Sequence, residues 1–215
     1  LSEKKIKSLK KGKIPIHEPG LEELIKKNVH AGRLLFSNNP KTAIKDADVI
    51  FIAVGTPMGN DGKADLKYVK SAARTIGKYL DSYTVICTKS TVPIGSGEKI
   101  TNIINNSKKN DATFDYISNP EFLREGSALN DFLWPDRVVI GGSSKKSFEV
   151  MREIYGPLFK NKQPIVYTTV ATAEMIKYAS NAFLALKISY INEVANLCES
   201  IGADVKQVSK VMGQD

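Results

Sequence analysis

Three polar residues that could bind a cofactor or move a proton each follow a short apolar run rich in β-branched residues. Thr56 follows the run at 49–54, Thr91 follows 84–88 and Glu121 follows 114–117. In a parallel sheet the loops at the carboxyl ends of the strands meet at one edge, where side chains and free backbone donors bind ligands. The sequence therefore predicts that Thr56, Thr91 and Glu121 share one rim.

A second carboxylate, Glu125, lies four residues after Glu121. A helical turn over this segment would bring the two carboxylates together and could separate their pKa values, as acid and base catalysis requires. A solvated pair of glutamates at the start of a helix has the same spacing. From spacing alone, both interpretations stand.

Lys177 and Asn181 are also four residues apart, and in a helix they lie on the same face, just before the most apolar stretch of the chain. An ammonium beside an amide in a desolvated setting would stabilise negative charge that develops on a substrate oxygen. In the alternative, Lys177 extends to water and Asn181 bonds a neighbouring loop. The residues alone favour this alternative.

Short apolar runs alternate with amphipathic stretches of helical period, which is typical of βα units that build a parallel sheet. Strands are predicted at 49–54, 84–88, 114–117, 137–140 and 165–167, and helices at 66–80, 97–104 and 146–158. Before the first of these strands, the pattern predicts helices at 3–9, from 18 onward and at 41–47, with a short strand at 34–36. The predicted fold class is α/β.

The last third of the chain differs from the rest. Residues 173–201 contain no Pro or Gly and predict one helix of about 40 Å, at 1.5 Å per residue. Its middle, 182–191, is apolar on nearly every face, so protein should cover both sides of it. Such a helix joins two domains or forms a dimer seam. Gly202 is expected to end it, and Asp204 to cap a last short helix.

The net charge of +8 would suit a nucleic-acid partner. The basic residues are scattered, however, and a general lysine bias or a smaller anionic ligand such as a nucleotide diphosphate explains the charge better. No apolar run reaches the length of a membrane span and no signal-like segment opens the chain, so we expect a cytoplasmic protein without nucleic-acid or membrane partners. Cys87 and Cys198 lie in apolar runs that suit buried, reduced thiols, and no metal site is expected.

Six motifs resemble the UDP-glucose/GDP-mannose dehydrogenase family, and they occur in order across most of the chain. They are HEPGL at 17–21, VGTP at 54–57, KSTVP at 89–93, NPEFLREG at 119–126, PDRVVIG at 135–141 and EMIKYASNAF at 174–183. Each alone is weak, but six with this spacing are specific together. The stretches at 58–66 and 130–137 look more like members that act on UDP-glucose than like members that act on GDP-mannose.

The resemblance implies a Rossmann-like, doubly wound parallel sheet that is truncated at its N-terminus and forms the NAD-binding domain over residues 1–171. A long central helix and the start of a helical dimerisation domain follow over residues 172–215. The implied cofactor is NAD. The implied substrate is UDP-glucose, whose C6 alcohol is oxidised twice, through an aldehyde and a cysteine thioester, to the carboxylate of UDP-glucuronate.

The family's site residues map onto this sequence by resemblance. The implied catalytic residues are Thr91, Glu121, Lys177 and Asn181. The implied cofactor contacts are Thr56, Thr91 and Glu125, the last beside the nicotinamide. The implied substrate contacts are Glu121, Phe122, Leu123, Glu125, Lys177 and Asn181.

Two features of the family do not occur between residues 1 and 215. No glycine-rich turn with an acidic ribose-binding residue follows a first strand, and neither Cys87 nor Cys198 occupies the motif of the nucleophilic cysteine. We therefore expect that the chain by itself cannot complete the four-electron oxidation. Because of its long helix, we also expect the chain to form a homodimer. The alternatives are a GDP-mannose or UDP-N-acetyl sugar dehydrogenase, and a non-catalytic nucleotide-sugar-binding or dimerisation module.

Overall fold

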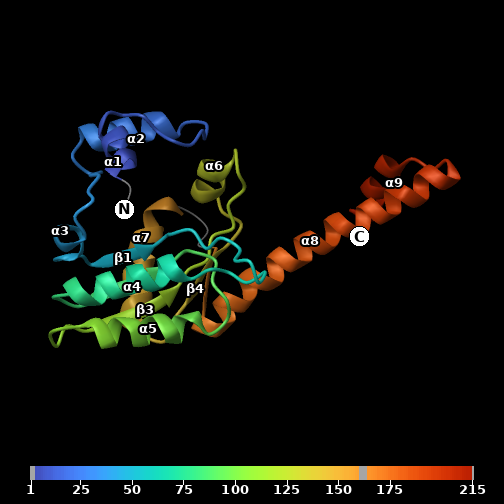
Figure 1. Ribbon diagram of the computed structural model, residues 1–215. Coiled ribbons are helices and arrows are strands. Elements are labelled where there is room, and N and C mark those ends of the chain that lie inside the picture. Colours follow the sequence, from blue (N-terminus) through green and yellow to red (C-terminus); the bar gives the residue numbers. More distant parts are fainter. Residues whose placement is uncertain (1–2, 160–163, 215) are drawn as a thin grey trace. The chain divides into compact units, whose positions relative to one another are not determined.

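The computed structural model describes residues 3–159 and 164–214, which divide into two compact units, Leu1–Glu174 and Met175–Asp215 (Figure 1). The first unit is a five-stranded sheet with helices on both faces, and the second is helical. The α/β, Rossmann-like fold class predicted from the sequence is confirmed.

The sheet contains β1 (Val49–Ile52), β2 (Thr84–Thr88), β3 (Phe114–Ser118), β4 (Val138–Gly141) and β5 (Ile165–Thr168), which lie side by side in chain order. The strands β1, β2 and β3 are parallel, as predicted, and so are β4 and β5. In contrast to the prediction of a wholly parallel sheet, β3 and β4 meet antiparallel through the single pair Ser118↔Gly141. The connection between them stays at the carboxyl edge with the short helix α6 (Ala128–Leu133), so the chain re-enters the sheet from that edge.

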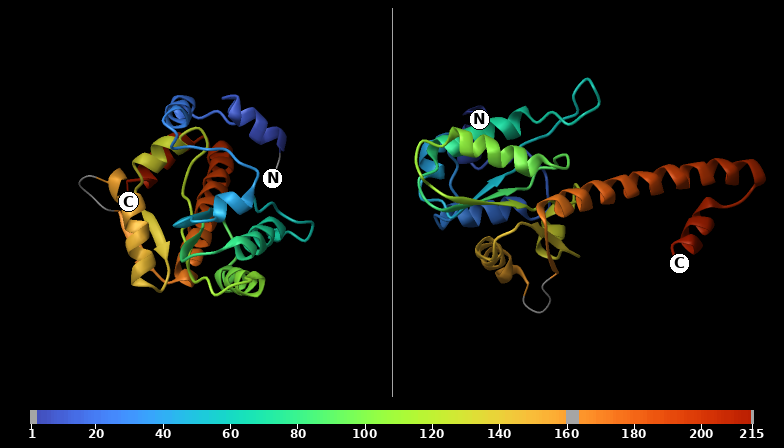
Figure 2. Two further views of the ribbon diagram at one scale, coloured as in Figure 1. Left: turned by 90° about the vertical axis from the view of Figure 1, so that its left-hand side faces the viewer. Right: turned by 90° about the horizontal axis from the view of Figure 1, so that it is seen from below.

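Helices α4 (Lys67–Tyr79) and α5 (Ser96–Ser107) cover one face of the sheet, and α7 (Lys145–Tyr155) covers the other (Figure 2). All residues of β2 are buried, which explains its continuous apolar run. Because side chains alternate along a strand, Ile86 packs with the helices of one face while Val85 and Cys87 pack toward α7. Two apolar cores therefore hold β2 in place and fix where its carboxyl end lies.

Three helices precede the sheet, α1 (Glu3–Lys10), α2 (Leu21–His30) and α3 (Pro40–Ile44). The strand predicted at 34–36 is wrong, because these residues form no strand and Leu35 is 82% exposed. A strand needs a neighbour whose backbone groups pair with its own, and none of the described strands lies beside this segment. The apolar pattern alone could not reveal whether such a neighbour was present.

A short 3₁₀ turn, η1 (Gly156–Leu158), precedes β5 in the chain. The element after β5 is the long helix α8 (Val170–Ile201). It begins three residues before its predicted start and ends as predicted at Gly202, whose φ is +74°. Asp204 caps α9 (Val205–Met212) by accepting a hydrogen bond from the Lys206 amide. Residues 182–190 are all exposed in the single chain, so the protein cover expected for them is not provided by the described residues and stays a prediction.

The close approach of α4 and α5 depends on Gly77. A Cβ at this position would lie 2.5 Å from the Ile104 carbonyl oxygen and 2.8 Å from the Ser107 Cβ. We expect Gly77→Ala to lower the free energy of unfolding by about 2 kcal/mol, because a backbone atom cannot give way as a flexible side chain can. Urea denaturation measures this, with Gly156→Ala as the control, since a Cβ there meets nothing within 4 Å. Equal stability of the two variants would contradict the close packing.

Candidate active site

The loops that follow β1 and β2 are tied together at the carboxyl edge of the sheet. The Thr56 hydroxyl donates to the Thr91 carbonyl at 2.9 Å, and the Ser90 hydroxyl donates to the Val54 carbonyl at 2.6 Å. Thr56 and Thr91 are both half-buried. The structure thus brings together two of the three residues predicted to share this rim.

The loop that follows β3 is anchored at its start by Asn119, which is fully buried. Its amide group donates to the Val139 carbonyl at 2.7 Å, and its side-chain oxygen accepts from the Tyr155 hydroxyl at 2.6 Å and from the Lys89 ammonium at 3.2 Å. Burial raises the pKa of Tyr155, so the hydroxyl remains a donor. This network joins the carboxyl ends of β2 and β3 to the end of α7.

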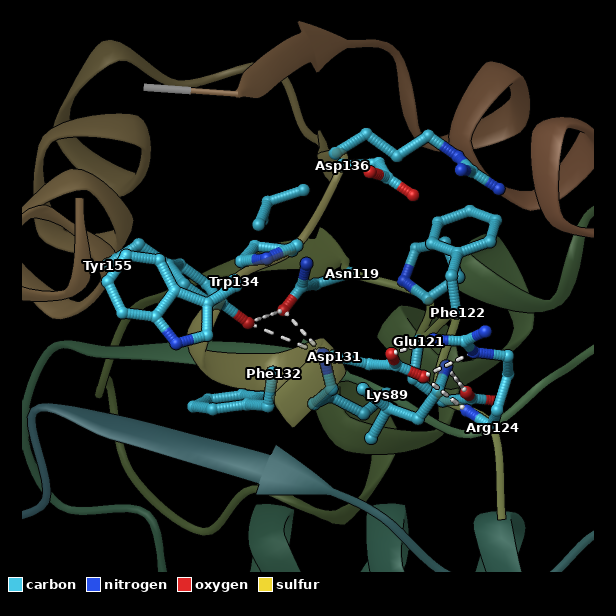
Figure 3. A pocket seen from close by; sticks show the side chains of 15 residues that line it. Lys89, Asn119, Glu121, Phe122, Arg124, Asp131, Phe132, Trp134, Asp136 and Tyr155 are labelled. Carbon is cyan, nitrogen blue, oxygen red and sulfur yellow. Dashed lines mark hydrogen bonds and ion pairs between the residues drawn. The ribbon is translucent and has the colours of Figure 1, made fainter. Parts of the chain in front are cut away.

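A cavity of about 320 Å³ opens over this network (Figure 3). Its wall contains Glu121, Phe122 and Leu123, three of the predicted site residues, together with cationic and aromatic side chains. Figure 3 shows Lys89, Asn119 and Tyr155 meeting through hydrogen bonds in this wall. The other described lining residues are Pro120, Arg124, Asp131, Phe132, Trp134, Pro135, Asp136, Arg137 and Val138.

The helical turn that would bring Glu121 and Glu125 together is not formed. Residues 119–127, which we call the Glu121 loop, are irregular, and α6 begins only at Ala128. The Leu123 amide bonds to the Glu121 carboxylate at 2.8 Å, and so it cannot enter a helical hydrogen bond. Glu125 is exposed at a turn, whereas Glu121 is half-buried in the cavity wall.

Charged side chains around the cavity are held by specific partners. Arg124 forms a two-pronged ion pair with Asp131, with nitrogen to oxygen distances of 2.7 and 3.0 Å, and this guanidinium lowers the pKa of Asp131 to about 2. The Arg137 guanidinium stacks on the Phe122 ring, 4.1 Å from its centroid. The cavity therefore presents fixed charges of both signs beside aromatic surface.

The site residues predicted from the sequence do not include Lys89, Asn119 or Tyr155. Lys89 and Asn119 are the first residues of the motifs KSTVP and NPEFLREG, and this position could have identified them. Tyr155 lies in the amphipathic pattern of α7, where an inward-facing tyrosine is indistinguishable from any other core residue.

The other two predicted catalytic residues, Lys177 and Asn181, lie one turn apart on α8 within the second compact unit. Lys177 is buried and Asn181 is exposed. The helix register thus agrees with the spacing argument that places them on the same face.

The start of α8 is joined to the start of α5 through Glu174, which is 2% exposed. Its carboxylate accepts the backbone amides of Gly95 at 2.7 Å and Gly97 at 2.8 Å. Burial raises the pKa of Glu174, although the bonds from these amides oppose the rise. Because α5 directly follows the loop that carries Thr91, this contact restrains the far end of that loop.

Neither cysteine in the chain has the surroundings of a nucleophile. Both are buried with free thiols, and burial raises the pKa of Cys87 to about 12. No cluster of three or more metal-binding side chains occurs within residues 3–159 and 164–214. Over the same part of the chain, no helix is long and apolar enough to cross a membrane.

The raised pKa of Glu174 gives a pH test of its burial. A carboxyl whose folded-state pKa lies above its ordinary value of 4.5 stabilises the fold below that value and loses this contribution as the pH rises through the folded-state pKa. We expect the stability of the wild-type chain relative to Glu174→Gln, measured by urea unfolding, to fall as the pH rises above about 4.5. Glu98→Gln, an exposed carboxylate in the first turn of α5, is the matched control. A relative stability that rises with pH would contradict the assignment.

Comparisons with known proteins cover both compact units. Residues 1–159 match the NAD binding domain of the UDP-glucose/GDP-mannose dehydrogenase family, and residues 171–215 match its central domain. The UDP-glucose 6-dehydrogenase of Rhizobium meliloti (strain 1021) is 54% identical over 99% of this chain and 49% of its own length. The chain therefore spans about half the length of this relative.

Solved structures agree in fold. The UDP-glucose dehydrogenase of the archaeon Pyrobaculum islandicum superposes with a TM-score of 0.95 at 39% identity, and the match covers 100% of this chain and 50% of that one. The GDP-mannose dehydrogenase of Pseudomonas aeruginosa superposes with a TM-score of 0.93 at 36% identity, with the same coverage of 100% and 50%. By sequence and by fold over both of its units, this chain belongs to the UDP-glucose/GDP-mannose dehydrogenase family.

Proposed function

We propose that this chain forms part of a cytoplasmic, NAD-dependent dehydrogenase that oxidises the C6 alcohol of UDP-glucose to the carboxylate of UDP-glucuronate in two hydride transfers. The observation that carries the proposal is the gathering of family motif residues at one sheet edge. Thr56 and Thr91 are hydrogen-bonded there, and Glu121 follows the adjacent parallel strand. High identity to a UDP-glucose 6-dehydrogenase supports the choice of sugar.

The residues on the rim of β1 and β2 suit a nicotinamide dinucleotide. A Cβ placed on Gly55 would meet nothing within 4 Å, so a flat ring or a phosphate could approach the backbone beside Thr56. Thr56, Thr91 and Glu125 would hold the cofactor here, within a domain proposed to extend over residues 1–171. NAD, when bound, would supply the hydride acceptor for each oxidation step.

Proton transfer and charge stabilisation fall to different side chains. Glu121 and Thr91 assist proton transfer and the hydrolysis of the cysteine thioester. Lys177 and Asn181 hold the reacting oxygen and stabilise its developing negative charge. Phe122, Leu123 and the neighbouring backbone bind the nucleotide sugar. The buried surroundings of Lys177 favour this role, because a desolvated ammonium attracts an anionic oxygen strongly.

The chain also carries a surface suited to a second copy of itself. Phe183, Leu186, Tyr190, Val194, Leu197 and Ile201 recur at intervals of three or four residues along α8. Most of this stripe is exposed in the single chain, with Leu186 at 62% and Ile201 at 68%. Such spacing forms the seam of paired helices, and we propose that the stripe forms the seam of a homodimer.

Steady-state kinetics of the complete enzyme test the proposed role of Glu121. With NAD and UDP-glucose, Glu121→Gln should lower kcat by about a hundredfold or more, because an amide cannot take up the proton. Glu153→Gln, which removes an exposed carboxylate on α7, should leave kcat unchanged. The chain of residues 1–215 alone should form no NADH.

The same assay with GDP-mannose and with UDP-N-acetylglucosamine distinguishes the substrates. We expect UDP-glucose to have the highest kcat/KM. A higher value for either of the other sugars would rule out the proposed substrate and leave the dehydrogenase assignment intact. Full activity of Glu121→Gln would instead argue against the proposed role of Glu121.

Sedimentation equilibrium of the complete enzyme tests the seam on α8. Leu186→Glu should weaken dimerisation at least about a hundredfold, because a carboxylate would be buried in an apolar contact. Asn192→Glu places the same charge about half a turn from the stripe, at 3.6 residues per turn, and should leave the dimer intact. A dimer that survives Leu186→Glu would show that this stripe is not the interface.

A further inference from the structure

Glu18 binds two backbone amides of a segment that lies more than a hundred residues further along the chain. One carboxylate oxygen accepts the Gly126 amide at 2.8 Å, and the other accepts the Ala128 amide at 3.1 Å. Glu18 belongs to the motif HEPGL, for which the dehydrogenase mechanism proposed above has no use. The segment that leads into α2 is thereby fixed to the end of the Glu121 loop, and α2 and α6 lie near each other (Figures 1 and 2).

The two amides need an acceptor from outside their own segment. They lie at the start of α6, where backbone donors have no partner within the helix, and the N-cap residue Ser127 makes no side-chain cap bond. Gly126 has a φ of +79°, so the chain turns sharply just before the helix. A negatively charged acceptor at a helix start is stabilised by the hydrogen bonds themselves and by the positive partial charge of the amides exposed there.

The two segments also approach each other closely just after Glu18. Gly20, with a φ of +80°, brings its backbone against α6, and a Cβ there would lie 3.3 Å from Leu129 Cδ2. Glu18 itself is half-buried, which limits competition from water. The sequence Glu-Pro-Gly thus supplies an acceptor and then a turn that lets the chain pass close to α6.

The other described restraints that come from outside the Glu121 loop and α6 act nearer its start, where Asn119 bonds to Val139 and Tyr155 and the Arg137 guanidinium stacks on the Phe122 ring. The restraints nearer its end come from within the loop or from α6. The Leu123 amide bonds to Glu121, two residues away, and Arg124 bonds to Asp131 in α6. These contacts shape the loop but move with it. Glu18 is attached to a different part of the first unit, and it can therefore fix where the loop ends.

We infer that Glu18 is a positioning residue for the Glu121 loop, and that it sets the placement of Glu121, Phe122 and Leu123 toward the nucleotide sugar. The role of the loop in the reaction rests on the proposed function, whereas the restraint by Glu18 does not. The motif HEPGL then has a physical purpose, which is to hold a substrate-binding loop from outside.

Residue-resolved amide hydrogen exchange on the chain tests the restraint directly. In Glu18→Ala, the Gly126 and Ala128 amides should exchange at least about tenfold faster, because two hydrogen bonds to a charged acceptor are lost. In Glu18→Gln, which keeps one acceptor oxygen, the increase should be smaller. Val85 and Ile86 in the buried strand β2 report global unfolding and should exchange as in the wild type.

The matched control is Glu23→Gln, which removes an exposed carboxylate from the first turn of α2. It should leave the Gly126 and Ala128 amides protected. Unchanged exchange of these two amides in Glu18→Ala would overturn the inference. So would an equal acceleration at Val85 and Ile86, because Glu18 would then support only the overall stability of the fold.

Kinetics of the complete enzyme test the consequence for the reaction. Glu18→Ala should lower kcat/KM for UDP-glucose by about tenfold, with partial rescue in Glu18→Gln and no loss in Glu23→Gln. Normal kcat/KM together with faster loop exchange would contradict positioning. A wild-type enzyme that turns over no nucleotide sugar would refute the proposed function, and the exchange result would still decide whether Glu18 restrains the loop.

Discussion

The parallel pairing of β1, β2 and β3 is the constraint that makes a site possible in this chain. Their register places the ends of β1 and β2 beside each other, with Ile52 opposite Thr88, and the ends of β2 and β3 beside each other, with Thr88 opposite Ser118. The residues after each strand must then meet at one edge, although they are some thirty positions apart. Burial of β2 on both faces keeps this register, because a slip would turn its side chains out of both cores.

Two carboxylates that accept pairs of backbone amides, the buried Glu174 and the half-buried Glu18, restrain the far ends of the loops that follow the strands. Glu174 restrains the segment beyond Thr91, and Glu18 restrains the segment beyond Glu121. In both cases the acceptor comes from a distant part of the chain and the donors are amides near a helix start. A loop held only by the strand before it would be free at its other end. These two side chains fix that end, and neither of them lines the cavity beside Glu121.

The features that depend on local pattern were predictable, and those that depend on distant partners were not. Alternation and turn residues located β1 to β5 and the end of α8 at Gly202, because these signals belong to the segment itself. The strand predicted at 34–36 is absent and β4 runs antiparallel, because both depend on neighbours that periodicity does not encode. For the same reason, their positions after neighbouring strands predicted the grouping of Thr56 with Thr91, but no pattern predicted the role of Asn119 or Tyr155. The helical pairing of Glu121 with Glu125 failed because a side chain captured the amide that a helix would need.

The start of α8 shows how closely a helix can pack against this sheet unit where glycines face it. Its first residues belong to the sheet unit, where Val170 lies close to Gly97 and Ala173 lies close to Gly141. A Cβ on either glycine would come within 2.5 Å of those side chains, so only glycine permits this approach. Glu174 adds hydrogen bonds to the same contact, which leaves little freedom for α8 to rotate about its axis at this end. The first turn of α8 is therefore fixed to the sheet unit by its close approach to two glycines and by the hydrogen bonds of Glu174.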